Sequence, residues 1–285
     1  MFSSVSSVVN FLMTPKSEKE LAFLQDLYVA TDWGERFAEL VDAHVDLPKE
    51  GRALYVGAGT GSHAMALQER AKDKLVFVCV DASEECLELA RVKALAMNEK
   101  AEFHRESPTA LSFRDDQFDL VLSDFSLAPF ADLPRHLSEL IRVARPGATV
   151  AWWLPTAGSF GEFFSIYWEA LQNSELQDHG VDVEQMITET PTVSAVEKFA
   201  EKEGLGHLAS WTAIEEFDYD SGEQFFNSPL ITDFLMRGWL APVPETARER
   251  VMQELARIID EERHSGAFAL SVKATLVLGR KGRVQ

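Results

Sequence analysis

One glycine-rich turn constrains this chain more than any other stretch of its sequence. Residues 52–56, RALYV, read as a buried β-strand, and Gly57-Ala58-Gly59-Thr60-Gly61 follows at once. Glycine has no Cβ, so its backbone can adopt positive φ and let a ligand approach the main chain closely. Residues 63–70 then predict a helix whose first N–H groups face the same place. A strand, a glycine turn and a helix in this order indicate a site for a ligand that contains a nucleoside.

The spacing of the three glycines separates two classes of such ligands. The dinucleotide fingerprint G-x-G-x-x-G needs its third glycine at position 62, where this chain has Ser62. The third glycine comes one residue earlier, at Gly61, which disfavours a dinucleotide. A glycine turn can also serve only to let a helix pack closely, so the turn alone is a weak sign of function.

Three further stretches follow the turn in order. An apolar run over residues 74–80 ends in Asp81, and a helical pattern begins after Ala82-Ser83. Residues 113–124, FRDDQFDLVLSD, and residues 139–147, ELIRVARPG, come later. Together with G-x-G-x-G, these stretches resemble the class I S-adenosylmethionine-dependent methyltransferases, in particular the group that includes the quinone-biosynthesis enzymes. The resemblance is specific over residues 51–155 and thin elsewhere.

The resemblance implies an α/β fold with a doubly wound, seven-stranded, mostly parallel sheet of the Rossmann-like methyltransferase type. The alternation of strand and helix patterns predicts the same class of sheet. We expect the last two strands to form an antiparallel pair. The expected strands cover residues 53–56, 75–80, 101–104, 118–123, 148–154, 211–219 and 268–278.

We predict a single methyltransferase-like domain over residues 1–285. Its expected parts are an N-terminal helical cap (1–48), a cofactor-binding core (49–155), helical lid or substrate segments (156–210 and 221–265) and closing strands (211–219 and 267–279). The second lid segment should contain a helix that starts at Glu245, because apolar residues recur there on one helical face. These residues are Val251, Leu255, Ile258 and Ile259.

The resemblance also implies S-adenosylmethionine as the cofactor and indicates which residues bind it. The turn from Gly57 to Gly61 would hold the methionine end, and Asp81 would accept hydrogen bonds from both ribose hydroxyls. Taken alone, Asp81 could equally cap the helix that follows it. The expected cofactor-binding residues are Tyr55, Gly57, Ala58, Gly59, Thr60, Gly61, Asp81, Ala82, Ser107, Pro108, Asp124 and Phe125.

Methyl transfer by in-line displacement needs few catalytic residues, because the sulfonium methyl is already activated and the protein mainly positions the reactants. A general base helps when the acceptor is a hydroxyl or an ammonium group, and Asp124 is our candidate. Asp124 could instead cap the next helix or contact the cofactor's amino group. Either of these two roles is favoured over that of a base. The seven histidines show no metal-ligand spacing, so we predict no metal.

Two positions depart from the family's pattern. The family commonly has an acidic residue two positions before the first glycine, where this chain has Tyr55. A neutral phenol pairs poorly with the cofactor's ammonium, so weak cofactor binding or a different ligand stays open. The family also often has Gly-Asp-Ala before the fourth strand, where this chain has Glu106-Ser107-Pro108; Ser107 can still accept one hydrogen bond.

Composition restricts the partners. The chain has 46 Asp and Glu against 27 Lys and Arg, a net charge of −19, which disfavours nucleic acid. Cys79 and Cys86 read as small buried hydrophobes in a reducing compartment. Residues 1–13 lack the positive start of a signal peptide, and no apolar stretch is long enough to span a membrane. We therefore expect a cytoplasmic protein, and its oligomeric state is not indicated.

Aromatic residues gather in the two lid segments. Elements beyond the carboxyl ends of the strands can cover the ligand crevice of such a sheet, so these rings predict a small, apolar or aromatic methyl acceptor. For any one ring, packing within the insertion is the commoner role. The rings are Phe160, Phe163, Phe164, Tyr167 and Trp168 in the first segment, and Phe225, Phe226, Phe234 and Trp239 in the second.

Three functions stay open on the sequence alone. A small-molecule methyltransferase is favoured. A non-catalytic protein of the same fold that binds S-adenosylmethionine or another nucleoside is the first alternative, because of Tyr55 and the lack of a clear base. A dinucleotide-dependent oxidoreductase is the second, and Ser62 disfavours it.

Overall fold

The computed structural model describes residues 16–262 and 266–282 of the chain. The expectation about a signal peptide at residues 1–13 lies outside these residues. The chain divides into two compact units. The sheet unit is built from Ser17–Pro155, Pro191–Ala213 and the chain after Ala274, and the helical unit mainly from Thr156–Thr190 and Ile214–Lys273. No helix within the described ranges is long and apolar enough to cross a membrane.

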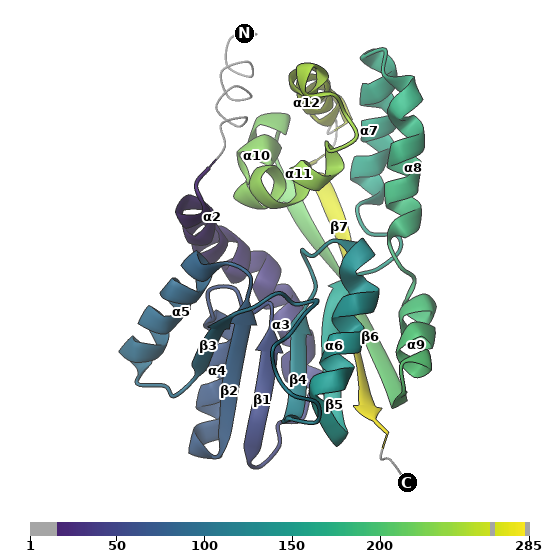
Figure 1. Ribbon diagram of the computed structural model, residues 1–285. Coiled ribbons are helices and arrows are strands. Elements are labelled where there is room, and N and C mark those ends of the chain that lie inside the picture. Colours follow the sequence, from purple (N-terminus) through teal and green to yellow (C-terminus); the bar gives the residue numbers. More distant parts are fainter. Residues whose placement is uncertain (1–15, 263–265, 283–285) are drawn as a thin grey trace. The chain divides into compact units, whose positions relative to one another are not determined.

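The predicted seven-stranded sheet is confirmed, with the strand order β3-β2-β1-β4-β5-β7-β6 (Figure 1). Strands β1 to β5 run parallel to one another, and β7 pairs antiparallel with β5. Every expected strand overlaps an observed one, although β6 starts earlier than expected. The strands are β1 (Gly51–Val56), β2 (Leu75–Asp81), β3 (Glu102–Arg105), β4 (Phe118–Asp124), β5 (Ala144–Pro155), β6 (Leu205–Tyr219) and β7 (Phe268–Lys281).

Helices lie on both faces of this sheet, as a doubly wound fold requires. In Figure 1, α6 (Leu133–Val143) lies in front of the sheet and α4 (Ser62–Ala71) lies behind it. The expected apolar face of α5 (Glu84–Met97) is buried through Cys86, Leu87, Ala90 and Ala94. The sheet unit also contains α2 (Glu18–Leu24), the π-helix η1 (Gln25–Gly34), α3 (Glu35–His44), the short 3₁₀ helices η2 (Lys72–Lys74) and η3 (Phe130–Asp132), and α9 (Val193–Lys202).

The helical unit has an aromatic core. Phe163 stacks on Trp239 with ring centroids 4.2 Å apart, and Phe225 contacts Phe163 and Phe268. Most rings that the sequence placed in the lid segments are therefore buried against one another, which supports the packing role for them. This unit contains α7 (Gly161–Asn173), η4 (Gln177–His179), α8 (Gly180–Glu189), α10 (Gly222–Asn227), the π-helix η5 (Leu230–Leu235), α11 (Met236–Trp239) and α12 (Glu245–Glu262).

The ELIRV stretch of α6 has a structural role. The guanidinium of Arg142 donates to the carbonyl oxygens of Leu111 (2.9 Å) and Phe113 (2.7 Å) and to the carboxylate of Glu139 (2.7 Å). Glu139 in turn accepts the backbone N–H of Leu111 at 2.7 Å. These two side chains therefore fasten the loop that leads into β4 to the helix α6 that follows β4.

This role predicts a stability difference between two arginine variants. Arg142→Ala removes charged hydrogen bonds to two carbonyls and should lower the free energy of unfolding by about 2–3 kcal/mol. The matched control is Arg257→Ala on α12, which removes only surface ion pairs with Glu254 and Glu261 and should cost about 1 kcal/mol or less. Urea denaturation measures both, and equal losses would contradict the assigned role.

Candidate functional site

The glycine turn brings the ends of β1 and β4 into very close approach. A Cβ on Gly57 would lie 2.5 Å from the carbonyl oxygen of Asp124, and one on Gly61 would lie 2.8 Å from the Cβ of Ala90. Both residues have positive φ, 72° and 80°. Glycine is therefore required at these positions by the fold itself, because a side chain would collide with β4 or with α5.

Most amides of the turn are used within the fold. The N–H groups of Gly57 and Ala58 donate to the carbonyl of Val80, and that of Gly61 donates to the carbonyl of Ala58. The N–H of Gly59 donates to the carboxylate of Asp81 at 2.8 Å. A ligand beside this turn would therefore be held mainly by side chains and carbonyl groups, rather than by these four amides.

Asp81, at the end of β2, braces the turn. Its second carboxylate oxygen accepts the N–H of Ser83 at 2.9 Å. The N-cap of α5 is Ser83, whose hydroxyl accepts the N–H of Cys86, so Asp81 is not the cap that the sequence left open. Partial burial raises the pKa of Asp81, against the lowering effect of the backbone amides of Ser83, Gly59 and Ala82. A carboxylate has four acceptor positions, which leaves capacity for ligand hydroxyls.

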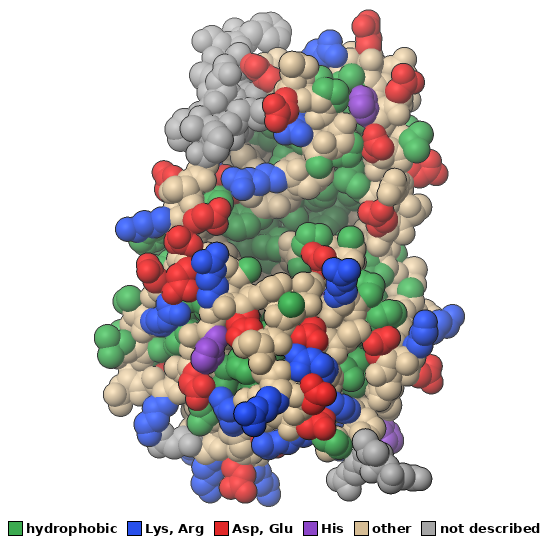
Figure 2. All heavy atoms as spheres, viewed as in Figure 1, with side chains coloured by type: hydrophobic (Ala, Val, Ile, Leu, Met, Phe, Trp, Pro, Cys, Tyr) green, Lys and Arg blue, Asp and Glu red, His purple; other side chains and the backbone are tan. Residues whose placement is uncertain are grey.

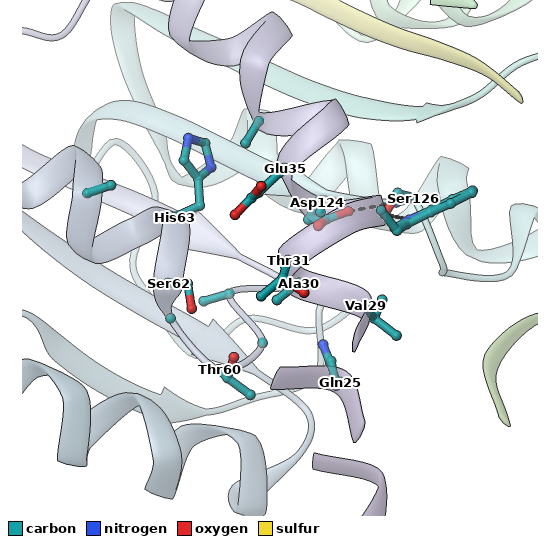
Figure 3. A pocket seen from close by; sticks show the side chains of 18 of the residues that line it. Gln25, Val29, Ala30, Thr31, Glu35, Thr60, Ser62, His63, Asp124 and Ser126 are labelled. Carbon is teal, nitrogen blue, oxygen red and sulfur yellow. Dashed lines mark hydrogen bonds between the residues drawn. The ribbon is translucent and has the colours of Figure 1, made fainter. Parts of the chain in front are cut away.

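A cavity of about 460 Å³ lies along the turn, entirely within the sheet unit (Figure 3). This volume lies within the usual range of small-molecule sites. Figure 3 shows Gln25 and Thr60 near one end of the cavity, and His63, Glu35 and Asp124 around the other. Seven residues of the predicted cofactor set line it: Tyr55, Gly57, Ala58, Gly59, Thr60, Gly61 and Asp124.

The remaining predicted residues lie outside the cavity lining. Asp81 reaches the turn only through Gly59. Ala82 and Ser107 are exposed, and the hydroxyl of Ser107 lies 3.1 Å from that of Thr109. Pro108 is half-buried, and Phe125 is fully buried with its ring edge-on to His136. The part these five residues play in cofactor binding stays a prediction.

The N-terminal segment forms a wall of the cavity that the sequence analysis did not assign to the site. The indole N–H of Trp33 donates to Ser126 at 2.9 Å, and the hydroxyl of Thr60 donates to Asp26 at 2.5 Å. Gln25 lies against Gly59. A π-helix is wider than an α-helix and often occurs at functional sites, but its apolar spacing differs from the 3.6-residue period sought in sequences. The capping box at Ser17 and Glu20 was the available signal of a helix start.

The charge of the cavity is predominantly acidic. Among its described lining residues are four carboxylates, from Glu35, Glu39, Asp42 and Asp124, and neither Lys nor Arg. His63 is the one imidazole in this set. Opposite charges attract strongly where solvent is partly excluded. The cavity therefore favours ligands with positively charged groups.

Tyr55 and His63 form a pair at the wall of this cavity. The hydroxyl of Tyr55 lies 2.9 Å from Nδ1 of His63, and Nε2 of His63 lies 3.5 Å from the carboxylate of Asp42. Burial and the charge of Asp124 raise the pKa of Tyr55 well above its usual value, so Tyr55 stays a neutral phenol. His63 was not singled out from the sequence, although its place at the start of the helix after the turn was visible there.

Asp124, the candidate base, accepts the N–H of Ser126 at 2.8 Å. Burial raises the pKa of Asp124, while hydrogen bonds from Ser126 and Trp153 and the charge of His63 lower it. The carboxylate thus lines the cavity and also holds the backbone after β4. Asp124 does not cap the next helix, η3, whose N-cap is Pro129. A role as a base stays a prediction.

The two cysteines are placed as expected. Both are buried, and burial raises the pKa of Cys79 to about 12 and that of Cys86 to about 11. Thiols with such pKa values are poor nucleophiles at neutral pH. In the part of the chain that the structure describes, no group of three or more His, Cys, Asp or Glu side chains could hold a metal ion.

Comparison with known proteins identifies the family. The sequence model of a protein family, the methyltransferase domain, matches residues 53–147. Demethylmenaquinone methyltransferase of Thermus thermophilus is 33% identical over 172 residues, which cover 59% of this chain and 72% of that enzyme. The chain belongs to the class I S-adenosylmethionine-dependent methyltransferases. The resemblance seen in the sequence is thereby confirmed, and so is S-adenosylmethionine as the cofactor.

Another curated relative and two solved structures are also similar to this chain. The demethylmenaquinone methyltransferase of Deinococcus radiodurans is 34% identical over 146 residues, 50% of this chain and 59% of that enzyme. YcgJ of Bacillus subtilis has a TM-score of 0.56 at 17% identity, covering 88% of this chain and all of that one. Phosphoethanolamine N-methyltransferase 2 of Haemonchus contortus, solved with S-adenosyl-L-methionine, has a TM-score of 0.56 at 15% identity, covering 97% of this chain and 60% of that one. At these identities the two structures bear on the fold alone.

We expect the stability of the folded protein to depend on pH through Asp124. Because burial raises the pKa of Asp124, the folded state holds this proton more tightly than the unfolded chain. Stability therefore falls as pH rises from the unfolded value of 3.8 through the folded pKa, and the loss is complete at neutral pH. Asp124→Asn should raise the Tm of the ligand-free protein at pH 7 by about 2–4 °C, with a smaller gain near pH 4.

Thermal melts followed by circular dichroism measure this effect. The control is Asp46→Asn, which changes an exposed carboxylate and should leave the Tm within about 1 °C. A lower Tm for Asp124→Asn at pH 7 would mean that the ionised carboxylate stabilises the fold, contrary to this expectation.

Proposed function

We propose that this protein transfers the methyl group of S-adenosylmethionine to a small molecule. The observation that carries the proposal is the acidic cavity along the glycine turn, which runs to Asp124 at the end of β4. S-adenosylmethionine has a sulfonium and an ammonium group, and both suit a cavity lined by carboxylates without Lys or Arg. Membership of the methyltransferase family supports the same reading.

The chain's residues would act mainly by positioning. The tight turn from Gly57 to Gly61 lets the cofactor lie against the backbone, and Asp81 would accept its ribose hydroxyls. Alignment of nucleophile, methyl carbon and sulfur can supply about 7–11 kcal/mol of the barrier reduction. Where the acceptor carries a proton, Asp124 is the lining carboxylate at the end of β4 that could take it.

For the acceptor we propose a small, largely apolar or aromatic molecule. Two curated relatives are named for methylating demethylmenaquinone, an acceptor of this class. The net charge of −19 opposes nucleic acid, and Figure 2 shows acidic and basic side chains interspersed on one face.

Cofactor binding gives the first test. Asp81→Ala should weaken the affinity for S-adenosylhomocysteine at least tenfold, since charged hydrogen bonds to the ribose are lost. Isothermal titration calorimetry measures this, with Asp46→Ala as the control for a lost surface charge. The Tm of each variant is recorded because Asp81 also holds Gly59. An unchanged affinity in Asp81→Ala would remove Asp81 from the site.

Activity gives the second test. Wild-type protein incubated with methyl-labelled S-adenosylmethionine should label a naphthoquinol acceptor and leave a small amine unlabelled. Binding without transfer to any acceptor would favour the non-catalytic alternative. Tighter binding of NAD than of S-adenosylmethionine in the same calorimeter would favour the oxidoreductase and overturn the proposal.

A further inference from the structure

Tyr55 stands where the family commonly has an acidic residue, and its hydroxyl is paired with His63. Tyr55 is the last residue but one of β1 and His63 is the second residue of α4, so the two residues lie on either side of the glycine turn in the sequence. The ring of Trp153 is edge-on to both, with centroids 5.6 Å from Tyr55 and 6.1 Å from His63. Both residues line the cavity. The phenol is therefore held by packing in one orientation, with its hydroxyl at Nδ1 of His63.

Asp42 determines how that hydrogen bond is directed. Its carboxylate lies 3.5 Å from Nε2 of His63, and the hydrogen bond with His63 holds the pKa of Asp42 below its usual range. An ionised carboxylate favours an N–H on Nε2, which leaves Nδ1 of the neutral ring as an acceptor. The hydroxyl of Tyr55 must then donate to Nδ1. The lone pairs of its oxygen remain available to a donor in the cavity.

We propose that His63 and Asp42 make the phenol of Tyr55 an acceptor for the ammonium group of the cofactor, in place of the family's carboxylate, and that protonation of His63 reverses this. The inference rests on the proposed function, because it concerns the same cavity. Here Tyr55 is a binding residue, whereas His63 and Asp42 act as positioning residues.

The reversed state follows from the same geometry. A protonated imidazole donates from both nitrogens, so Nδ1–H donates to the oxygen of Tyr55, and the phenol proton turns elsewhere. The imidazolium also repels positive charge in the cavity. S-adenosylmethionine carries a net charge of +1, from its sulfonium, ammonium and carboxylate, whereas S-adenosylhomocysteine is neutral overall. Protonation should therefore weaken binding of the cofactor more than binding of its product.

The charged groups around His63 come from three elements, α3, α4 and β4. On α3, Asp42 faces the ring, and Glu35 and Glu39 line the same cavity; on α4, Arg70 contacts Asp42. Strand β4 supplies Asp124, whose charge interacts with His63, and β1 supplies the neutral Tyr55. Trp153 on β5 carries no charge. Asp124 is thus the other group whose titration could alter the cavity, and it needs its own control.

The experiment compares cofactor and product at two pH values. Isothermal titration calorimetry gives the dissociation constants of S-adenosylmethionine and S-adenosylhomocysteine at pH 8 and pH 5.5, across the range in which imidazoles exchange a proton. In the wild type, lowering the pH should weaken S-adenosylmethionine at least about fivefold more than S-adenosylhomocysteine. His63→Gln, which does not titrate, should abolish this difference. Asp124→Asn should keep it.

A second variant tests the hydroxyl directly. Tyr55→Phe keeps the ring packed on Trp153 and should weaken both ligands about equally at pH 8, by roughly threefold to tenfold, because both carry the ammonium. A purely structural role would lower the Tm without weakening binding in folded protein, and that result would overturn the inference.

The other outcomes separate the two proposals. If His63→Gln keeps the wild-type pH dependence, or Asp124→Asn loses it, the inference is wrong while the proposed function stands. If the wild type binds neither ligand at millimolar concentration at either pH, the proposed function fails and the inference fails with it.

Discussion

The close approach of Gly57 to the carbonyl oxygen of Asp124 determines most of the site. Neighbouring parallel strands normally carry side chains where they end, but a Cβ here would lie only 2.5 Å from that oxygen. The absence of a side chain lets β1 turn sharply beside the end of β4. Tyr55, the glycine turn and Asp124 therefore come to line one cavity, although nearly seventy residues separate the first from the last.

The fold could be predicted well because its signals are local and repeated. The apolar runs that became β1, β2, β4 and β5 are buried on both faces, so each one appears in the sequence as a nearly continuous hydrophobic stretch. The exposed start of β6 lacks such a run, which explains why the predicted strand began too late at Trp211. The expected pairing of the last two strands came from the resemblance alone; in the structure β7 lies between β5 and β6 and pairs antiparallel with β5.

The site was less predictable, because it depends on contacts between distant segments. The turn and Asp124 were found from their strands, whereas Trp33 and Gln25 reach the cavity from a π-helix with no familiar spacing. Three N–H groups of the turn already have partners, because Val80 and Asp81 accept their hydrogen bonds. No periodic pattern reveals that an amide already has a partner.

Residues that match the family's pattern and residues that depart from it carry different information about this chain. Glu139 and Arg142 match the family's pattern, and the structure uses them to fasten a loop to α6. Neither side chain lines the cavity, so this match bears on the fold and not on the ligand. Tyr55 departs from the pattern at a position that faces the ligand cavity. The role proposed for His63 and Asp42 rests on their place beside this phenol, with His63 next to its hydroxyl and Asp42 on the far side of the imidazole. The match at Glu139 and Arg142 therefore explains part of the fold, whereas the departure at Tyr55 bears on what the cavity can bind.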